Sequence, residues 1–254
     1  MDLKRHKINI LGVEVDDISE KDAVFAILKM AKEKRQKYVV TVNGEFVMLA
    51  RRDPNFMQIL NGADLAVPDG QWPVWAKLIL GGKEHERVTG VDMIEKLCEK
   101  SAEKAISVGF LGGFSNVANE VSKRQKSKNP TLKVAFAGSG DPAIGYDLRL
   151  KEEFSVVGRV DILFVAYGMG QQEFFIKRNI NSLDVGVFIG VGGAFDYLSM
   201  VKMRAPVWLQ NIGFEWLWRL IAEPSRAKRM IRVFPMFWIL IFWQKLKNTA
   251  FFKK

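Results

Sequence analysis

Short β-branched runs alternate with helical patterns from about residue 8 to residue 191, and this alternation constrains the fold more than any other feature. Between the first two runs, Ser19 is expected to cap a helix in which Ala23, Ile27, Met30 and Ala31 recur at helical spacing. The expected strands cover residues 8–15, 38–42, 65–67, 106–111, 132–137, 160–166 and 185–191. The pattern predicts an α/β fold: a mostly parallel sheet with helices on both faces, as in a Rossmann-like core.

The polar and glycine-rich exceptions to this pattern follow the ends of the expected strands. They are Thr41 and Asn43, Asp69, Gly112 and Gly113, residues 168–173 and residues 192–196. In open α/β sheets, ligands bind beyond the carboxyl ends of the strands. The sequence therefore predicts one binding site along that edge.

The C-terminal segment differs from the rest of the chain in charge and in tryptophan content. Residues 201–254 contain eleven lysines and arginines against Glu215 and Glu223, a net charge of +9, which leaves +1 of the total +10 for residues 1–200. The same segment holds five of the seven tryptophans. We expect a catalytic α/β core at 1–200 and a basic, helical, membrane-associating appendage at 201–254.

Residues 234–243 form an uninterrupted apolar run within this appendage. The run is too short to span a bilayer, which takes roughly 20 apolar residues. Insertion at an anionic membrane surface fits the tryptophans and basic residues better than nucleic-acid binding, and a buried C-terminal helix is the alternative. A single cysteine, Cys98, and no secretory h-region predict a cytoplasmic protein, peripheral on the inner face of the membrane.

Asp69 is the first candidate for chemistry, because Pro68 and Gly70 flank it just after a strand. Such a carboxylate can act as a general base, although a capping or turn aspartate has the same pattern. Gly192 and Gly193 form a turn whose backbone amides can approach a phosphate, and a plain tight turn is the alternative. Gln172 can hydrogen-bond a sugar or a base, or it can lie in a solvated first helical turn.

Arg219, Arg226 and Arg229 are spaced seven and three residues apart and would share one face of a continuous helix. Three guanidinium groups on one face suit a diphosphate or a lipid headgroup. Pro224 interrupts that helix, and i,i+4 ion pairs of Arg219 with Glu215 and Glu223 are the alternative.

Several absences narrow the class of enzyme. The two histidines, His6 and His85, lie far apart in the sequence, so neither a hydrolase triad nor a His/Cys metal cluster is expected. The chain has no Asp-x-Asp pair to hold a metal against a nucleotide-sugar diphosphate, and it shows no second acid at an obvious spacing from Asp69. We expect no metal and no cofactor.

Taken together and in this order, the motifs resemble the WecG/TagA/CpsF glycosyltransferase family, glycosyltransferase family 26. The matching stretches are Thr41-Val42-Asn43, Pro68-Asp69-Gly70, residues 87–92, Gln172-Glu173, residues 190–196, Arg204-Ala205-Pro206, Glu215-Trp216, Arg219-Leu220 and residues 223–226. The resemblance runs from about residue 8 to residue 232. Two departures are Gly170, where the family usually has proline, and Met200, where glycine is common.

The resemblance implies an inverting transfer from a UDP-sugar to a lipid-linked acceptor. The best-known members move N-acetylmannosamine to undecaprenyl-diphosphate-linked N-acetylglucosamine in teichoic acid synthesis. The resemblance makes Asp69 the catalytic base, places Thr41, Asn43 and Gln172 in the substrate pocket, and puts Asp196 on the nucleotide side. It assigns the three arginines to an appendage that closes over the site and touches the membrane.

Two other classes of function compete with this interpretation. A non-catalytic adaptor that binds membrane or nucleic acid would explain the basic appendage but not the polar residues at the strand ends. A dinucleotide oxidoreductase would need a G-x-G-x-x-G fingerprint after a strand, which neither glycine turn has. The transferred sugar and the oligomeric state, a homo-oligomer included, stay open.

Overall fold

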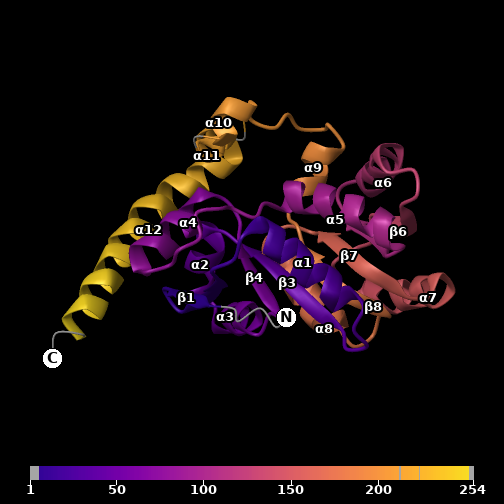
Figure 1. The fold of residues 1–254 in the computed structure, drawn as a ribbon, viewed down its shortest axis with the longest axis horizontal. Helices are drawn as coiled ribbons and strands as arrows, with labels where there is room; N and C mark the ends of the chain where they lie inside the picture. The colour runs from indigo at the N-terminus through magenta and orange to yellow at the C-terminus, as the bar shows by residue number, and fades with distance from the viewer. Residues whose placement is uncertain (1–5, 212, 223, 252–254) are drawn as a thin grey trace.

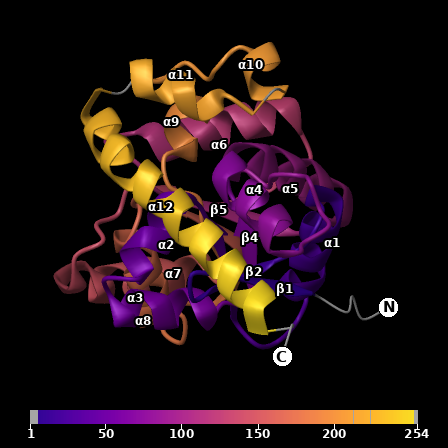
Figure 2. The same cartoon turned by 90° about the vertical axis from the view of Figure 1, so that its left-hand side faces the viewer.

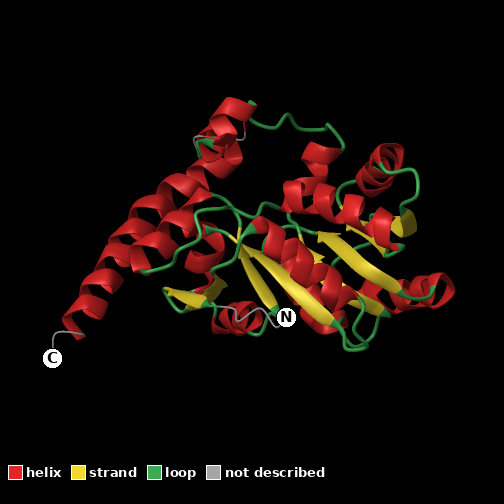
Figure 3. Ribbon diagram, in the orientation of Figure 1, coloured by secondary structure: helices red, strands yellow, loops and turns green. Residues whose placement is uncertain are grey.

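The computed structural model describes residues 6–211, 213–222 and 224–251, and at residues 211, 219, 220, 224–229 and 251 it describes the backbone alone. In this part of the chain, helices cover both faces of a six-stranded sheet, as Figure 1 and Figure 3 show. Every neighbouring pair of strands in that sheet is parallel. The predicted fold class is confirmed.

The six strands lie in the order β4-β3-β8-β7-β5-β6. Their bounds are β3 Lys37–Val42, β4 Leu65–Pro68, β5 Ser107–Gly112, β6 Lys133–Gly138, β7 Val160–Ala166 and β8 Val185–Gly190. Each agrees with a predicted strand to within one residue. Because β4, β3 and β8 are neighbours, their carboxyl ends meet at one place on the edge of the sheet.

The expected strand over residues 8–15 is wrong, because this segment is a separate antiparallel hairpin. It consists of β1 (Lys7–Ile10) and β2 (Val13–Asp16). Leu11 and Gly12 join the two strands with φ of 52° and 99°. Two successive positive φ angles make the tight turn that matches the twist of a hairpin.

Two groups of helices cover the sheet, one on each face, and each group has its own cluster of buried apolar side chains. The first comprises α2 (Gly44–Ala50), α3 (Pro54–Asn61), α4 (Gln71–Leu80), α7 (Asp147–Val157), α8 (Gln171–Asn179) and α12 (Pro224–Phe251). The second comprises α1 (Glu20–Ala31), α5 (Gly90–Lys104), α6 (Val117–Lys128) and α9 (Ala194–Leu198). A short 3₁₀ helix, η1 (Ile144–Tyr146), precedes α7. Ser19 caps α1 as predicted, since its hydroxyl accepts the N–H of Asp22.

The C-terminal segment forms α10 (Val207–Asn211), α11 (Glu215–Ala222) and the long helix α12, which lies across α2 and α4 in Figure 2. On its inner face, Phe237 and Ile241 are fully buried and pack with Trp72 of α4 in one cluster. On its outer face, Ile239 and Phe242 are 63% and 55% exposed. No helix in the described residues is both long enough and apolar enough to cross a membrane.

Candidate active site

Two cavities meet at the carboxyl ends of β3 and β4. The first, the glycine-turn cavity, has a volume of about 260 Å³. Thr41, Gly168, Met169, Gln172, residues 191–194 and Tyr197 are among the residues that line it. It therefore occupies the predicted edge of the sheet, beyond strands β3, β7 and β8.

The second, the aromatic cavity, is smaller, about 70 Å³, and lies between the core and the C-terminal segment. Gln71, Trp72 and Arg87 line it from the core, and Trp216 and Met230 line it from α11 and α12. The indole N–H groups of Trp72 and Trp216 are buried without a hydrogen-bond partner in the described part of the chain. The cavity thus brings aromatic side chains of the core and of the C-terminal segment together.

Asp69 lies where the two cavities adjoin, and it lines both of them. Its N–H donates to the carbonyl oxygen of Val42 at 2.8 Å, which fixes the residue beside the end of β3. The next residue, Gly70, has a φ of 84°, a conformation that favours glycine, and it is the N-cap of α4. The flanking residues that drew attention to Asp69 in the sequence therefore hold its backbone in place.

Asn43, Glu45 and Thr89 line both cavities beside Asp69. Asn43 caps α2, and its side-chain oxygen accepts the N–H of Phe46 at 3.0 Å. Glu45 stands in the first turn of that helix and is only 7% exposed. Glu45 is therefore a second acid beside Asp69, where the sequence showed none at an obvious spacing, although a carboxylate two residues after the predicted site residue Asn43 was a usable signal.

Thr41 and Gln172 both line the glycine-turn cavity, and their side chains also bind the end of β8 and the turn that follows it. The Thr41 hydroxyl donates to the carbonyl oxygen of Gly190 at 2.9 Å. The Gln172 side-chain oxygen accepts the N–H of Gly192 at 2.8 Å. That amide group of Gly192 is thereby engaged inside the protein, while the backbone of Gly192 and Gly193 lines the cavity.

Asp196 lies in α9 and is not among the residues that line either cavity. Its carboxylate forms an ion pair with Lys202 at 2.8 Å. Its role on the nucleotide side stays a prediction.

The three arginines of the predicted diphosphate site are divided between two helices. Arg219 belongs to α11, whereas Arg226 and Arg229 belong to α12, so one continuous helix does not carry all three. Their side chains lie outside the described part of the structure.

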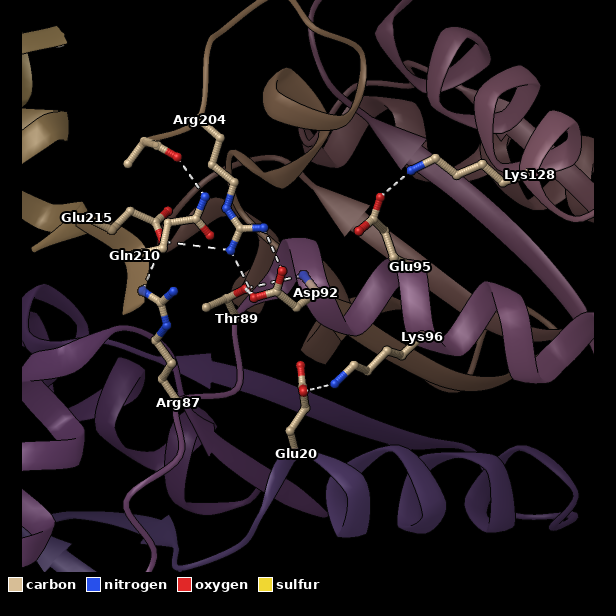
Figure 4. A network of polar contacts seen from close by, with 11 residues as sticks. Glu20, Arg87, Thr89, Asp92, Glu95, Lys96, Lys128, Arg204, Gln210 and Glu215 are labelled. Atoms are coloured by element: carbon tan, nitrogen blue, oxygen red, sulfur yellow. Dashed lines mark hydrogen bonds and ion pairs between the residues drawn. The ribbon is translucent and has the colours of Figure 1, made fainter. Parts of the chain in front are cut away.

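A network of charged residues joins the C-terminal segment to the core, and Figure 4 shows it. The Arg204 guanidinium binds both carboxylate oxygens of Asp92, at 2.5 and 2.9 Å. Glu215 of α11 pairs with Arg87 at 3.0 Å and lies 3.7 Å from Arg204. Burial alone would raise the pKa of Asp92, but hydrogen bonds from Arg204 and Thr89 hold it below its usual value.

The loop between α4 and α5 carries Arg87 and Thr89, and Asp17, a member of a buried ion pair, anchors the start of this loop. Lys77 is fully buried and its ammonium donates to Asp17 at 2.8 Å. The same carboxylate accepts the N–H groups of Lys83 and Glu84. The start of the loop is therefore fixed to the N-terminal part of the chain.

The sequence pattern predicted no role for Arg87, Trp72 or Trp216, although residues 87–92 and 215–216 are among the stretches that resemble the family. Their contribution depends on the docking of the C-terminal segment, which no local pattern reveals. In the described residues, no group of three or more histidines, cysteines or carboxylates is placed to hold a metal ion.

The sequence is similar to those of known proteins. A protein of Bacillus spizizenii named N-acetylglucosaminyldiphosphoundecaprenol N-acetyl-beta-D-mannosaminyltransferase is 31% identical over 206 residues, 79% of this chain and 77% of the relative. A protein of Bacillus subtilis with the same name is 29% identical over 218 residues, 85% of this chain and 83% of the relative. The sequence model of the glycosyl transferase WecG/TagA/CpsF family matches residues 8–250. This chain therefore belongs to the WecG/TagA/CpsF family of glycosyl transferases.

Proposed function

We propose that this glycosyltransferase moves N-acetylmannosamine from a UDP-linked donor to N-acetylglucosamine on undecaprenyl diphosphate, with inversion at the anomeric carbon. Both Bacillus relatives are named for this acceptor and this transferred sugar. The observation that carries the proposal is the position of Asp69 at the junction of two cavities. An inverting glycosyltransferase needs a donor site and an acceptor site, with a base between them to take the proton of the acceptor hydroxyl.

The donor is assigned to the glycine-turn cavity and the acceptor to the aromatic cavity. Glycine turns at strand ends let the backbone approach a diphosphate closely. The aromatic cavity is bounded by Trp216 and Met230 of the C-terminal segment, which also carries the exposed apolar face of α12. A lipid-linked acceptor would reach Asp69 from that side.

Asp69 would accept the proton of the acceptor hydroxyl while the oxygen of that hydroxyl forms a bond to the anomeric carbon of the donor sugar. The bond from that carbon to the diphosphate oxygen breaks, and UDP leaves with the electron pair. Arg219, Arg226 and Arg229 would neutralise the charge that grows on the diphosphate, a contribution that is often the largest in such reactions. The chain would work at the cytoplasmic surface of the membrane, with α12 against anionic lipid.

Substitution Asp69→Asn tests the base directly. The change keeps the size of the side chain but removes its ability to take a proton, so turnover should fall by roughly 10²–10⁴. Binding of UDP, measured by calorimetry, should persist. Asp53→Asn is the matched control, because Asp53 caps α3 outside both cavities and asparagine caps helices equally well.

Near-normal turnover of the Asp69→Asn protein would overturn the assignment of the base. The same assay with EDTA tests the charge neutralisation. Turnover should be kept, because the arginines and not a metal neutralise the diphosphate. Loss that Mn²⁺ restores would contradict that role of the arginines.

A further inference from the structure

We propose that Glu173 is a positioning residue for the donor: through Gln172 it holds the turn of residues 190–193 where the nucleotide-sugar binds. The inference rests on the proposed function, because it takes the glycine-turn cavity as the donor site. It also changes the predicted role of Gln172, from a direct contact with the substrate to a support for the turn.

Three hydrogen bonds connect the start of α8 to the glycine turn. The N–H of Gly170 donates to one carboxylate oxygen of Glu173 at 2.8 Å. The side-chain amide of Gln172 donates to the other oxygen at 2.6 Å. The oxygen of that same amide accepts the N–H of Gly192 at 2.8 Å. Glu173 therefore fixes which way the Gln172 amide points, and Gln172 fixes the turn.

The supporting pair has almost no freedom to move. Gln172 and Glu173 are 0% and 1% exposed. A Cβ atom at Gly190 would lie 2.7 Å from the Gln172 nitrogen and 2.9 Å from the Glu173 oxygen, so the pair packs directly on the backbone of β8. On the other side, Thr41 binds the carbonyl oxygen of Gly190. The end of β8 is thus held by two elements that flank it.

A carboxylate is required at position 173 because both groups that approach it are donors. An ionised carboxylate only accepts hydrogen bonds, whereas a primary amide presents one oxygen and one NH₂ group. In the variant Glu173→Gln, the new NH₂ group must face either Gly170 N–H or the Gln172 amide. If Gln172 turns over to avoid this, its own NH₂ group faces Gly192 N–H. In each arrangement one buried donor meets another.

The double variant Gln172→Glu/Glu173→Gln should restore the connection. The new carboxylate at position 172 accepts Gly192 N–H with one oxygen and the new amide at position 173 with the other. The oxygen of that new amide accepts Gly170 N–H. All three bonds return with the charge moved by one residue, but the NH₂ group at position 172 is gone.

We would measure the dissociation constant of UDP and the KM of each substrate at about pH 8, where a carboxylate at either position is expected to be ionised. Glu173→Gln should weaken UDP binding and raise the donor KM by roughly tenfold, the size expected for one mismatched buried hydrogen bond. The acceptor KM should stay unchanged. The double variant should return UDP binding to within about threefold of the native value.

Unchanged UDP binding in Glu173→Gln, or a double variant no better than Glu173→Gln, would overturn the proposal. The second result would mean that the Gln172 amide itself contacts the donor. Asn179→Ala is the structural control: Asn179 is a buried polar residue at the other end of α8, bonded to Asp147 and to Phe175. It should lower Tm and leave UDP binding alone. If the native protein failed to bind UDP, the proposed function itself would fail.

Discussion

Among the residues at the candidate active site, Glu173 has the pKa that the fold shifts most clearly. Burial raises the pKa of its carboxyl group from 4.5 to about 7, while hydrogen bonds from Gln172 and Gly170 oppose that rise. A group with a raised pKa in the fold contributes stability below its unfolded pKa, and that contribution disappears as pH rises through the folded value. The free energy of unfolding should therefore lose on the order of 3 kcal/mol between about pH 4.5 and pH 7 from this residue.

Urea unfolding of the native protein and of Glu173→Gln across this pH range measures the effect. The difference between the two proteins isolates Glu173, because carboxylates with lowered pKa values, such as Asp17, Asp92 and Asp147, are common to both. The difference in free energy should shift in favour of the variant as pH rises. If the free energies of unfolding of the two proteins changed in parallel with pH, Glu173 would have an ordinary pKa in the folded protein.

Single residues were predictable from the sequence where their neighbours in the chain fix them. Asp69 is such a case, since proline and glycine flank it at a strand end. Gln172 lines a cavity at the predicted edge of the sheet. Its partners Gly192 and Glu173 determine what its amide does, and those contacts arise from the packing of α8 on β8. The sequence shows a residue's position along a strand edge more readily than its hydrogen-bond partner.

The two departures from the family pattern also gain a physical meaning. Met200 has a φ of 64° and Gly170 a φ of 85°. Left-handed backbone favours glycine, which accounts for the glycine common at the position of Met200. At Gly170 the usual proline could not adopt this φ, and it would lack the N–H that Glu173 binds. The loop before α8 therefore depends on a residue at position 170 that has an N–H group and tolerates a positive φ.

At the scale of elements, the pair of Asp92 on α5 and Arg204 holds the connection between α9 and α10 against the core. Both side chains are partly buried, and the guanidinium binds both carboxylate oxygens. Asp92→Asn should destabilise this docking by about 1–3 kcal/mol, because one partner of a charge-assisted pair is removed. Glu215 would then hold Arg87 less firmly beside the aromatic cavity.

Hydrogen exchange measures this loosening. Amides of α10 and α11 should exchange roughly tenfold faster in Asp92→Asn, whereas those of β8 should not change. Glu120→Gln is the control, since Glu120 forms an exposed ion pair with Lys123 on α6. Equal exchange in α10 and α11 of the native and Asp92→Asn proteins would show that other contacts dock the segment.

Elements with a regular apolar pattern were predicted well, and those shaped by tertiary contacts were not. The six strands of the sheet are buried, β-branched runs between turn residues, so their positions could be read to within one residue. The hairpin of β1 and β2 also carries β-branched residues, at alternate positions, and only Gly12 marks its turn. The network of Asp92, Arg204, Arg87 and Glu215 joins residues more than 100 positions apart, and no local pattern contains it.

At the scale of the whole molecule, the appendage and the core share buried contacts and a cavity, although the sequence predicted a boundary between them near residue 200. Phe237 and Ile241 of α12 are fully buried against the helices that carry the site. The aromatic cavity needs Trp216 and Met230 from the same segment. Docking of α12 on a membrane would therefore place the acceptor side of the site next to the lipid surface that supplies the acceptor.

The outer face of α12 is the surface that should make this docking. Its exposed apolar side chains recur at helical spacing beside exposed basic residues; they are Ile231, Met236, Ile239, Phe242, Trp243 and Leu246, with Arg232, Lys245 and Lys247. An apolar stripe flanked by positive charge suits the interface of an anionic bilayer. The spacing places the stripe opposite the buried Phe237 and Ile241.

The double variant Ile239→Glu/Phe242→Glu should lower binding to phosphatidylglycerol vesicles by a factor on the order of 100, because it removes two apolar side chains and adds two negative charges. Phe25→Glu is the matched control, since Phe25 on α1 is 56% exposed, like Phe242 at 55%, but lies on the opposite face of the sheet. Vesicle sedimentation measures the membrane binding of the double variant and of the control. In each protein, transfer to a short, water-soluble acceptor should stay near the native rate. If the double variant sediments with vesicles like the native protein, the outer face of α12 is not the docking surface. If it loses transfer to the soluble acceptor as well, the outer face of α12 supports the active site and is not only a membrane contact.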